Sequence, residues 1–107
     1  MTEGLLGLEI EEREEVVVAT LTGELDIAGA GATGERIGEA VPTSAHGLVV
    51  DMSTLAFIDS SGVAMLLQIR DDLDTMGCRL TLVDPSAPVI RVLTLLGLTE
   101  QFTFADI

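Results

Sequence analysis

The sequence contains no lysine, tryptophan or tyrosine, and it has only one cysteine, one histidine and three phenylalanines. Without lysine there is no amine for Schiff-base chemistry and no lysine to hold a phosphate group. One cysteine cannot form an intramolecular disulfide, and Cys78 with His46 supplies too few ligands for a zinc site. We therefore expect a reduced, cytoplasmic protein with no metal and no cofactor. Because Cys78 leads into an apolar stretch, we expect a buried structural thiol.

Long hydrophobic runs are also missing. No segment reaches about 18 uninterrupted apolar residues, and no basic segment precedes an apolar run at the amino terminus. The sequence thus predicts neither a membrane span nor a signal peptide. Hydrophobic residues still make up 48% of the chain, which is enough for one core built mainly from leucine, valine, isoleucine, alanine and methionine. We expect a single domain over residues 1–107, since this length leaves no room for a second core.

The charge of the chain is strongly one-sided, with a formal net charge of −13 at pH 7. Such a field repels nucleic-acid backbones and anionic membranes, so we expect no direct contact with either. A basic or amphoteric protein is the natural electrostatic partner. The alternative is that the acidity only keeps the domain soluble.

The hydrophobic pattern predicts alternating strands and helices after an opening hairpin. Strands are expected at 5–12 and 15–22, joined by a turn at Arg13-Glu14, then at 47–51, where the strand pattern resumes at 55–58, and at 79–84 and 101–104. A polar elbow is expected at 22–26. Helices are expected at 28–41, at 61–76 and between Ser86 and Gly97. Helical crossovers imply parallel strands, so the sequence predicts an α/β fold with a mixed, largely parallel sheet of about five strands covered by helices.

Two of the expected helices have informative compositions. Four glycines in 28–41 each cost about 1 kcal/mol relative to alanine, so this helix is expected to begin late or to fray. Helix 61–76 is expected to end at Gly77. Its buried stripe should contain Val63, Leu66, Leu67, Leu73 and Met76, and its solvated face should contain Arg70, Asp71, Asp72 and Asp74.

The turn Asp59-Ser60-Ser61-Gly62 lies where a strand pattern changes to a helical one. Its hydroxyl groups would lie beside free backbone N–H groups, as in an anion site, a nucleophile or a phosphate acceptor. Asp59 or Ser60 is expected to cap the helix in any case. Gly62 would let another backbone approach closely, and residues 60–65 would form a small apolar surface suited to a protein contact.

Two other interpretations of the sequence, as a hydrolase and as a nucleotide-binding protein, are disfavoured. A nucleophilic Ser60 or Ser61 needs a general base, yet His46 should lie at the far end of the intervening strand, so a hydrolase is disfavoured. Residues 29–34 match G-x-G-x-x-G, with Asp51 ending the next strand, which makes a small nucleotide-binding protein an alternative. Three features disfavour this alternative. Residues 24–28 separate the motif from its strand, and that strand is predicted to belong to an antiparallel hairpin. The chain is also too short to hold a cofactor-binding half and a substrate-binding half. We therefore expect no catalytic residue.

Residues 49–53 and 57–63 resemble the signature of STAS domains, and more narrowly that of bacterial anti-sigma factor antagonists. Residues 22–26 match a second family hallmark, and the element order agrees over essentially the whole chain. The resemblance implies a phosphoprotein that binds an anti-sigma factor with serine kinase activity when unphosphorylated, and so frees a sigma factor. It implies phosphorylation at Ser60 and a phosphatase that reverses it. It also implies a partner-binding site formed by Asp26, Asp59, Ser61, Gly62 and Val63.

A phosphate on Ser60 would add about −1.5 to −2 charges at pH 7. Free N–H groups and the dipole at the helix start are expected to accommodate it, so the fold should survive. At a close-packed interface the phosphate would be desolvated beside existing carboxylates, which costs several kcal/mol.

The sequence departs from the family pattern at Val63-Ala64, where Leu-Gly is more usual. A subunit of a stress-sensing or lipid-transport complex is an alternative, and the oligomeric state, monomer or weak dimer, stays open.

Overall fold

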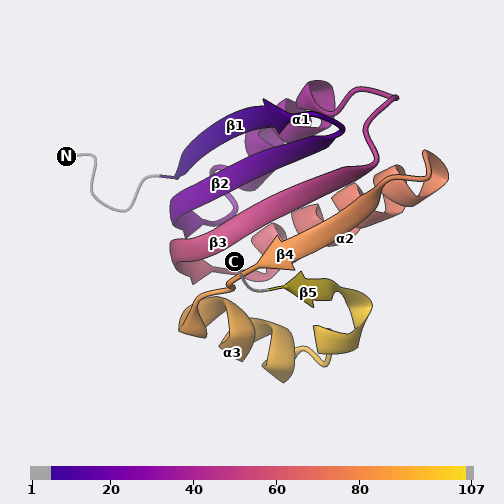
Figure 1. Cartoon of the computed structure of the whole chain (residues 1–107). Coiled ribbons are helices and arrows are strands. Elements are labelled where there is room, and N and C mark those ends of the chain that lie inside the picture. Colours follow the sequence, from indigo (N-terminus) through magenta and orange to yellow (C-terminus); the bar gives the residue numbers. More distant parts are fainter. Residues whose placement is uncertain (1–5, 106–107) are drawn as a thin grey trace.

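The computed structural model describes residues 6–105 and shows a five-stranded sheet with three α-helices (Figure 1). The strands are β1 (Gly7–Arg13), β2 (Val16–Leu25), β3 (Gly47–Ile58), β4 (Arg79–Val83) and β5 (Thr103–Ala105). The helices are α1 (Ala30–Ala40), α2 (Ser60–Thr75), α3 (Ala87–Leu95) and the short 3₁₀ helix η1 (Thr99–Gln101). The predicted start of the first strand at Leu5 lies outside the described residues.

The strands lie in the sheet in the order β1-β2-β3-β4-β5. Only β1 and β2 are antiparallel, and the three other pairs are parallel. This confirms the predicted mixed, largely parallel sheet. The hairpin turn lies at Glu14 and Glu15, one residue later than predicted, and Glu14 has a positive φ of 55°.

The predicted elbow at 22–26 was wrong in one respect, because β2 continues through it to Leu25. The pairing with β3 shifts register between Thr20 and Thr22 and again between Gly23 and Glu24. Gly23 has a φ of 83°, which a glycine adopts without a steric cost, so the strand bulges and continues. The two predicted strand segments 47–51 and 55–58 likewise form one strand, β3.

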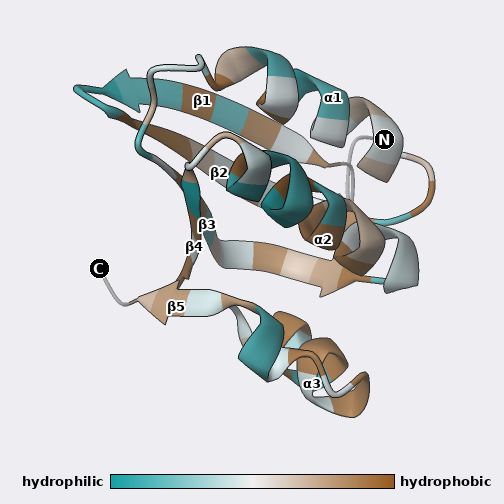
Figure 2. Cartoon of the chain, turned by 90° about the vertical axis from the view of Figure 1, so that its right-hand side faces the viewer, coloured by the Kyte–Doolittle hydropathy of each residue, from teal (hydrophilic) through white to brown (hydrophobic). Residues whose placement is uncertain are grey.

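The core lies between the sheet and the helices α1 and α2, which cover the same face (Figure 1). Alternate strand residues such as Leu21, Leu48 and Leu82 are fully buried there. Strand residues that point to the opposite face, including Val18 and Val49, are only half-buried. Figure 2 shows α1 and α2 side by side, with α3 set apart beside β5.

The helix boundaries agree with the predictions to within two residues at each end, with α1 beginning at Ala30 instead of residue 28. Gly77, with a φ of 71°, follows α2 as expected. The prediction that Met76 belongs to the buried stripe of α2 was wrong, because this residue lies beyond the last helical turn and is 40% exposed. Met65 and Ile69 are buried instead, since α1 lies over that side of the helix.

Helix α3 packs beside the carboxyl half of β3, which extends past the end of β4. Ser86 precedes the helix as predicted, but its hydroxyl group donates to the backbone oxygen of Leu55 at 2.6 Å rather than capping α3. This bond and the buried side chains of Val89 and Leu93 fix α3 to the sheet.

Candidate functional site

The parallel register of β2 and β3 brings the two sequence motifs together. Leu25 pairs with Ile58 at the carboxyl ends of these strands, so Asp26 and Asp59 follow at equivalent positions on one edge of the sheet. The backbone N–H of Asp59 also donates to the backbone oxygen of Leu25 at 3.2 Å. The elbow after β2 and the turn before α2 therefore form one continuous site.

Asp59 is the N-cap of α2 and also the link between the two loops. Its Oδ1 accepts hydrogen bonds from the backbone N–H groups of Ser61 at 2.9 Å and Gly62 at 3.1 Å. Its Oδ2 accepts one from the backbone N–H of Ile27 at 3.3 Å. Its backbone oxygen accepts from Val63 at 3.1 Å, which begins the helical hydrogen-bond pattern. One carboxylate thus fixes where α2 begins and where the neighbouring loop lies.

This cap changes the expected environment of a phosphate. The amides of Ser61, Gly62 and Val63 are already hydrogen-bonded to Asp59, so they are not the free N–H groups that the sequence suggested. Ser60 is the first residue of α2 and is exposed. A group attached to its hydroxyl would extend into solvent next to the half-buried Asp59 carboxylate.

Asp26 begins the turn that leads into α1. Its Oδ1 accepts from the backbone N–H of Ala28 at 3.1 Å, and its backbone oxygen accepts from Gly29 at 3.1 Å and Ala30 at 2.9 Å. The next side chain, Ile27, is 81% exposed. A large apolar group therefore stands uncovered beside the serine turn.

Gly62 and Val63 do not form part of the exposed surface, which corrects the expected surface over residues 60–65. Val63 is 2% exposed and Gly62 is buried. A Cβ at Gly62 would lie 2.7 Å from Ile58 Cγ1, 2.8 Å from Leu25 Cγ and 2.9 Å from the Leu25 backbone oxygen. The backbone that approaches this glycine is the protein's own, because α2 begins directly over the ends of β2 and β3.

The structure keeps His46 away from both serines, as predicted. His46 precedes β3 and Ser60 follows it, so the whole length of this 12-residue strand separates them. The imidazole Nδ1 instead lies 2.9 Å from Glu15 Oε2 at the hairpin end. His46 is therefore not a general base for Ser60 or Ser61.

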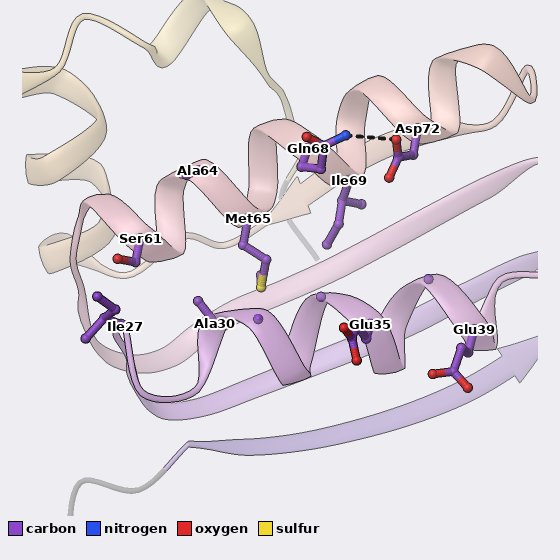
Figure 3. Close-up of a pocket in the computed structure, with 13 residues that line it drawn as sticks. Ile27, Ala30, Glu35, Glu39, Ser61, Ala64, Met65, Gln68, Ile69 and Asp72 are labelled. Carbon is purple, nitrogen blue, oxygen red and sulfur yellow. Dashed lines mark hydrogen bonds between the residues drawn. The ribbon is translucent and has the colours of Figure 1, made fainter.

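A groove of about 780 Å³ lies between α1 and α2 and was not predicted. Ile27 and Ser61 line one end, and Glu39 and Asp72 line the other (Figure 3). Gly31, Gly34 and Gly38 form its α1 side. Their spacing of three and four residues places them on one helix face, which is the sequence signal that could have revealed the groove.

The G-x-G-x-x-G pattern thus has a different role here. Gly29 is the N-cap of α1, and Gly31 and Gly34 face α2 instead of a phosphate-binding turn. Residues 26–28 do separate the motif from β2, as predicted, although β2 pairs with a parallel neighbour as well as an antiparallel one.

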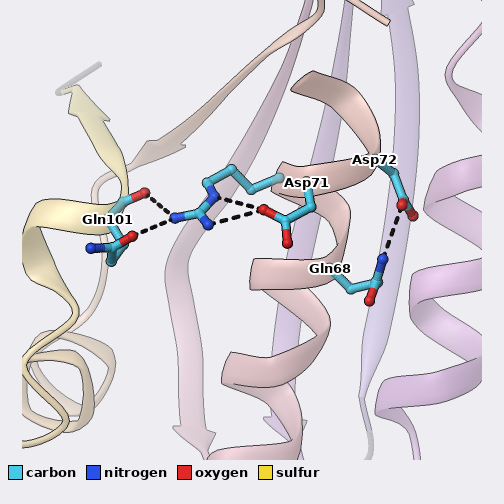
Figure 4. A network of polar contacts seen from close by, with 5 residues as sticks. Gln68, Asp71, Asp72 and Gln101 are labelled. Atoms are coloured by element: carbon cyan, nitrogen blue, oxygen red, sulfur yellow. Dashed lines mark hydrogen bonds and ion pairs between the residues drawn. The ribbon is translucent and has the colours of Figure 1, made fainter. Parts of the chain in front are cut away.

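A second cavity, of about 510 Å³, lies at the opposite end of α2 and contains Arg70 and Cys78. Arg70 was expected on the solvated face, but its Nη1 donates to the backbone oxygen and the Oε1 of Gln101, both at 2.9 Å. Its Nη2 lies 2.9 Å from Asp71 Oδ1 (Figure 4). Cys78 is buried, as expected, and this burial raises the pKa of its thiol.

Residues 6–105 contain neither a candidate metal site nor a helix suited to span a membrane. No three side chains of the His, Cys, Asp or Glu type come together there in a way that could hold a metal ion. None of the helices in this part of the chain has the length and apolar character needed to cross a membrane.

The chain resembles proteins of two kinds. It is 30% identical over 91 residues to sulfate transporter 3.1 of Arabidopsis thaliana. This match covers 85% of the present chain but only 14% of the transporter. It is 29% identical over 102 residues to the anti-sigma F factor antagonist of Paenibacillus polymyxa, covering 94% of this chain and 87% of that protein.

The fold agrees with solved structures of an anti-sigma factor antagonist, SpoIIAA. Its unphosphorylated form superposes with a TM-score of 0.79 at 28% identity, over 94% of this chain and 88% of that one. Its phosphorylated form, from Bacillus, gives 0.74 at 27% identity, over 94% and 91%. The profile of the STAS domain matches residues 7–107. The chain therefore belongs to the STAS domain family.

Proposed function

We propose that this protein is a bacterial, cytoplasmic anti-sigma factor antagonist that is switched by phosphorylation of Ser60. The observation that carries the proposal is the exposed Ser60 on the first turn of α2, held beside Asp26 and Asp59 at one sheet edge. Relatives of nearly the same length that share this fold are anti-sigma factor antagonists. In this role the protein binds a partner and catalyses no reaction itself.

The unmodified site suits a protein contact. Ser60 and Ile27 are exposed, and Ser61 is half-buried at the end of the groove. We infer that an anti-sigma factor with serine kinase activity docks over Ser60, Ser61 and the two aspartates. Gly62 and Val63 support this surface from beneath it, since both are buried.

The geometry around Asp59 explains how a phosphate would act. Because Asp59 already occupies the amides at the start of α2, a phosphate on Ser60 would find few donors within the chain. It would add about −1.5 to −2 charges beside a carboxylate. Covering it with a partner would then cost several kcal/mol, and each 1.4 kcal/mol is about tenfold in affinity. Phosphorylation would thus release the partner without unfolding the domain, and a phosphatase would restore binding.

The test is to compare Ser60→Ala and Ser60→Asp with the unchanged protein. Ser60→Ala should bind the anti-sigma factor of the source organism and take up no phosphate, whereas Ser60→Asp should bind weakly. Binding is measured by calorimetry and phosphorylation by mass spectrometry, with Ser61→Ala as the matched control. Phosphate uptake by Ser60→Ala would contradict the assignment, and labelling at Ser61 alone would move the site by one residue.

A further inference from the structure

The face of α1 that is turned toward α2 carries three glycines, Gly31, Gly34 and Gly38. A Cβ at Gly31 or at Gly38 would meet no atom within 4 Å, whereas one at Gly34 would lie 3.0 Å from Met65 Cγ. Met65 therefore reaches across Gly34, and open space remains at the other two glycines. Each glycine lowers helix stability by about 1 kcal/mol relative to alanine. The open groove is therefore accompanied by a less stable α1.

The groove is apolar along its floor and acidic at one end. Ala30, Ala64, Met65 and Ile69 contribute apolar surface, and the exposed Ile27 extends it toward Ser61 (Figure 3). Glu35, Glu39 and Asp72 provide carboxylates, and no arginine lines the groove. Gln68 Nε2 donates to Asp72 Oδ1 at 2.9 Å, which holds that carboxylate in place.

These features determine which kind of ligand fits. Three carboxylates and a net charge of −13 disfavour an anionic ligand such as a fatty acid or a nucleotide. Gly31 and Gly38 are two helical turns apart, or roughly 10 Å along α1. That spacing matches the i and i+7 anchors of an amphipathic helix lying in a groove.

We propose that the groove between α1 and α2 binds a basic amphipathic helix of the protein partner. Apolar side chains two turns apart fill the spaces at Gly31 and Gly38, and arginine or lysine residues meet Glu35, Glu39 and Asp72. The inference rests on the proposed function only in identifying that partner as the anti-sigma factor. It also explains the position of the switch, because Ser60 directly precedes Ser61, which lines the apolar end of the groove, so a docked partner would have to desolvate the phosphate.

The first test fills the groove and reverses its charge. Gly38→Leu and Glu39→Arg should each weaken binding of the purified anti-sigma factor by about tenfold or more. Ala32→Leu, which is on the exposed side of α1, and Glu12→Arg on β1 are the matched controls and should bind like the unchanged protein. Circular dichroism verifies that each variant is folded. Wild-type affinity of both groove variants would overturn the inference and leave the proposed function intact.

A second test does not depend on the anti-sigma factor. The probes are two synthetic amphipathic helical peptides with leucines two turns apart, one flanked by arginines and the other by glutamates. The arginine peptide should shift the amide NMR signals of Gly31, Gly38 and Ala64 in a saturable way, and the glutamate peptide should not. Equal responses to both peptides, or shifts confined to other parts of the chain, would overturn the inference. If no anti-sigma factor binds the unchanged protein, the proposed function fails and this second test alone decides on the groove.

Discussion

Asp59 shows how much one residue organises at this site. Its two carboxylate oxygens accept from three backbone N–H groups, two at the start of α2 and one in the loop before α1. The same residue begins the helix, joins two chain segments and leaves Ser60 exposed. A sequence motif predicts the cap, but the bond to Ile27 requires the two strands to be neighbours.

The two roles of Asp59 can be separated by substitution. Asp59→Ala removes the cap and the link to Ile27, so it should lower the free energy of unfolding by about 1–2 kcal/mol. Asp59→Asn keeps an oxygen for the cap but can place an amide nitrogen opposite the Ile27 N–H, so its loss should be smaller. Urea denaturation measures both values. If Asp59→Asn lowers the free energy of unfolding as much as Asp59→Ala does, the cap and the link to Ile27 are not separate contributions.

At the scale of elements, glycines in α1 and α2 act in opposite ways. Gly62 lets the start of α2 sit directly on β2 and β3, whereas Gly31 faces open space. The same residue type therefore permits a close contact at the start of α2 and leaves a space beside α1. Only the packing of each helix against its neighbours distinguishes the two.

Alanine substitutions should reveal this difference with opposite signs. Gly62→Ala places a methyl group against the Leu25 backbone oxygen, which cannot easily move, and should destabilise the domain by about 1–3 kcal/mol. Gly31→Ala meets no such obstacle and should stabilise it by about 0.5–1 kcal/mol. Thermal denaturation of the two variants side by side is the measurement. A stable Gly62→Ala protein would mean that α2 can shift away from the strands at little cost.

At the scale of the whole molecule, charge repulsion dominates the electrostatics. A net charge of −13 is carried by a domain only 36 × 32 × 25 Å in extent. The ion pairs Arg13–Glu11 and Arg70–Asp71 neutralise few of the carboxylates. At low salt, the charges therefore repel one another across the molecule.

Sodium chloride should consequently stabilise this protein. The Debye length falls from about 30 Å at 0.01 M to about 8 Å at 0.15 M, so repulsion between distant carboxylates is screened. A gain of about 1 kcal/mol would raise Tm by roughly 4–8 °C for a domain of this size. Calorimetry over this salt range measures the shift, and a variant with Glu9, Glu12 and Glu24 changed to glutamine should respond less. A Tm independent of salt would contradict this account of the charge.

The fold class, the family and the position of the serine turn could all be predicted from the amino-acid sequence. These follow from local patterns, since strand and helix periodicity, the Asp59-Ser60-Ser61-Gly62 motif and Gly77 can each be read within a few residues. It did not reveal that β2 passes through the elbow, because Gly23 permits a bulge whose use depends on β3. It placed Gly62 and Val63 on the surface, although the strand ends beneath α2 bury them.

The surroundings of Ser60 depend on how the chain folds in three dimensions. The bond from Ile27 to Asp59 and the groove along α1 both join residues distant in sequence, whereas the amides that Asp59 occupies belong to a local cap of α2. Their positions depend on the parallel pairing of β2 with β3 and on the packing of α1 against α2. Helix propensity predicts that the glycines of α1 lower its stability. The packing of α1 against α2 shows which of these glycines leave the groove open.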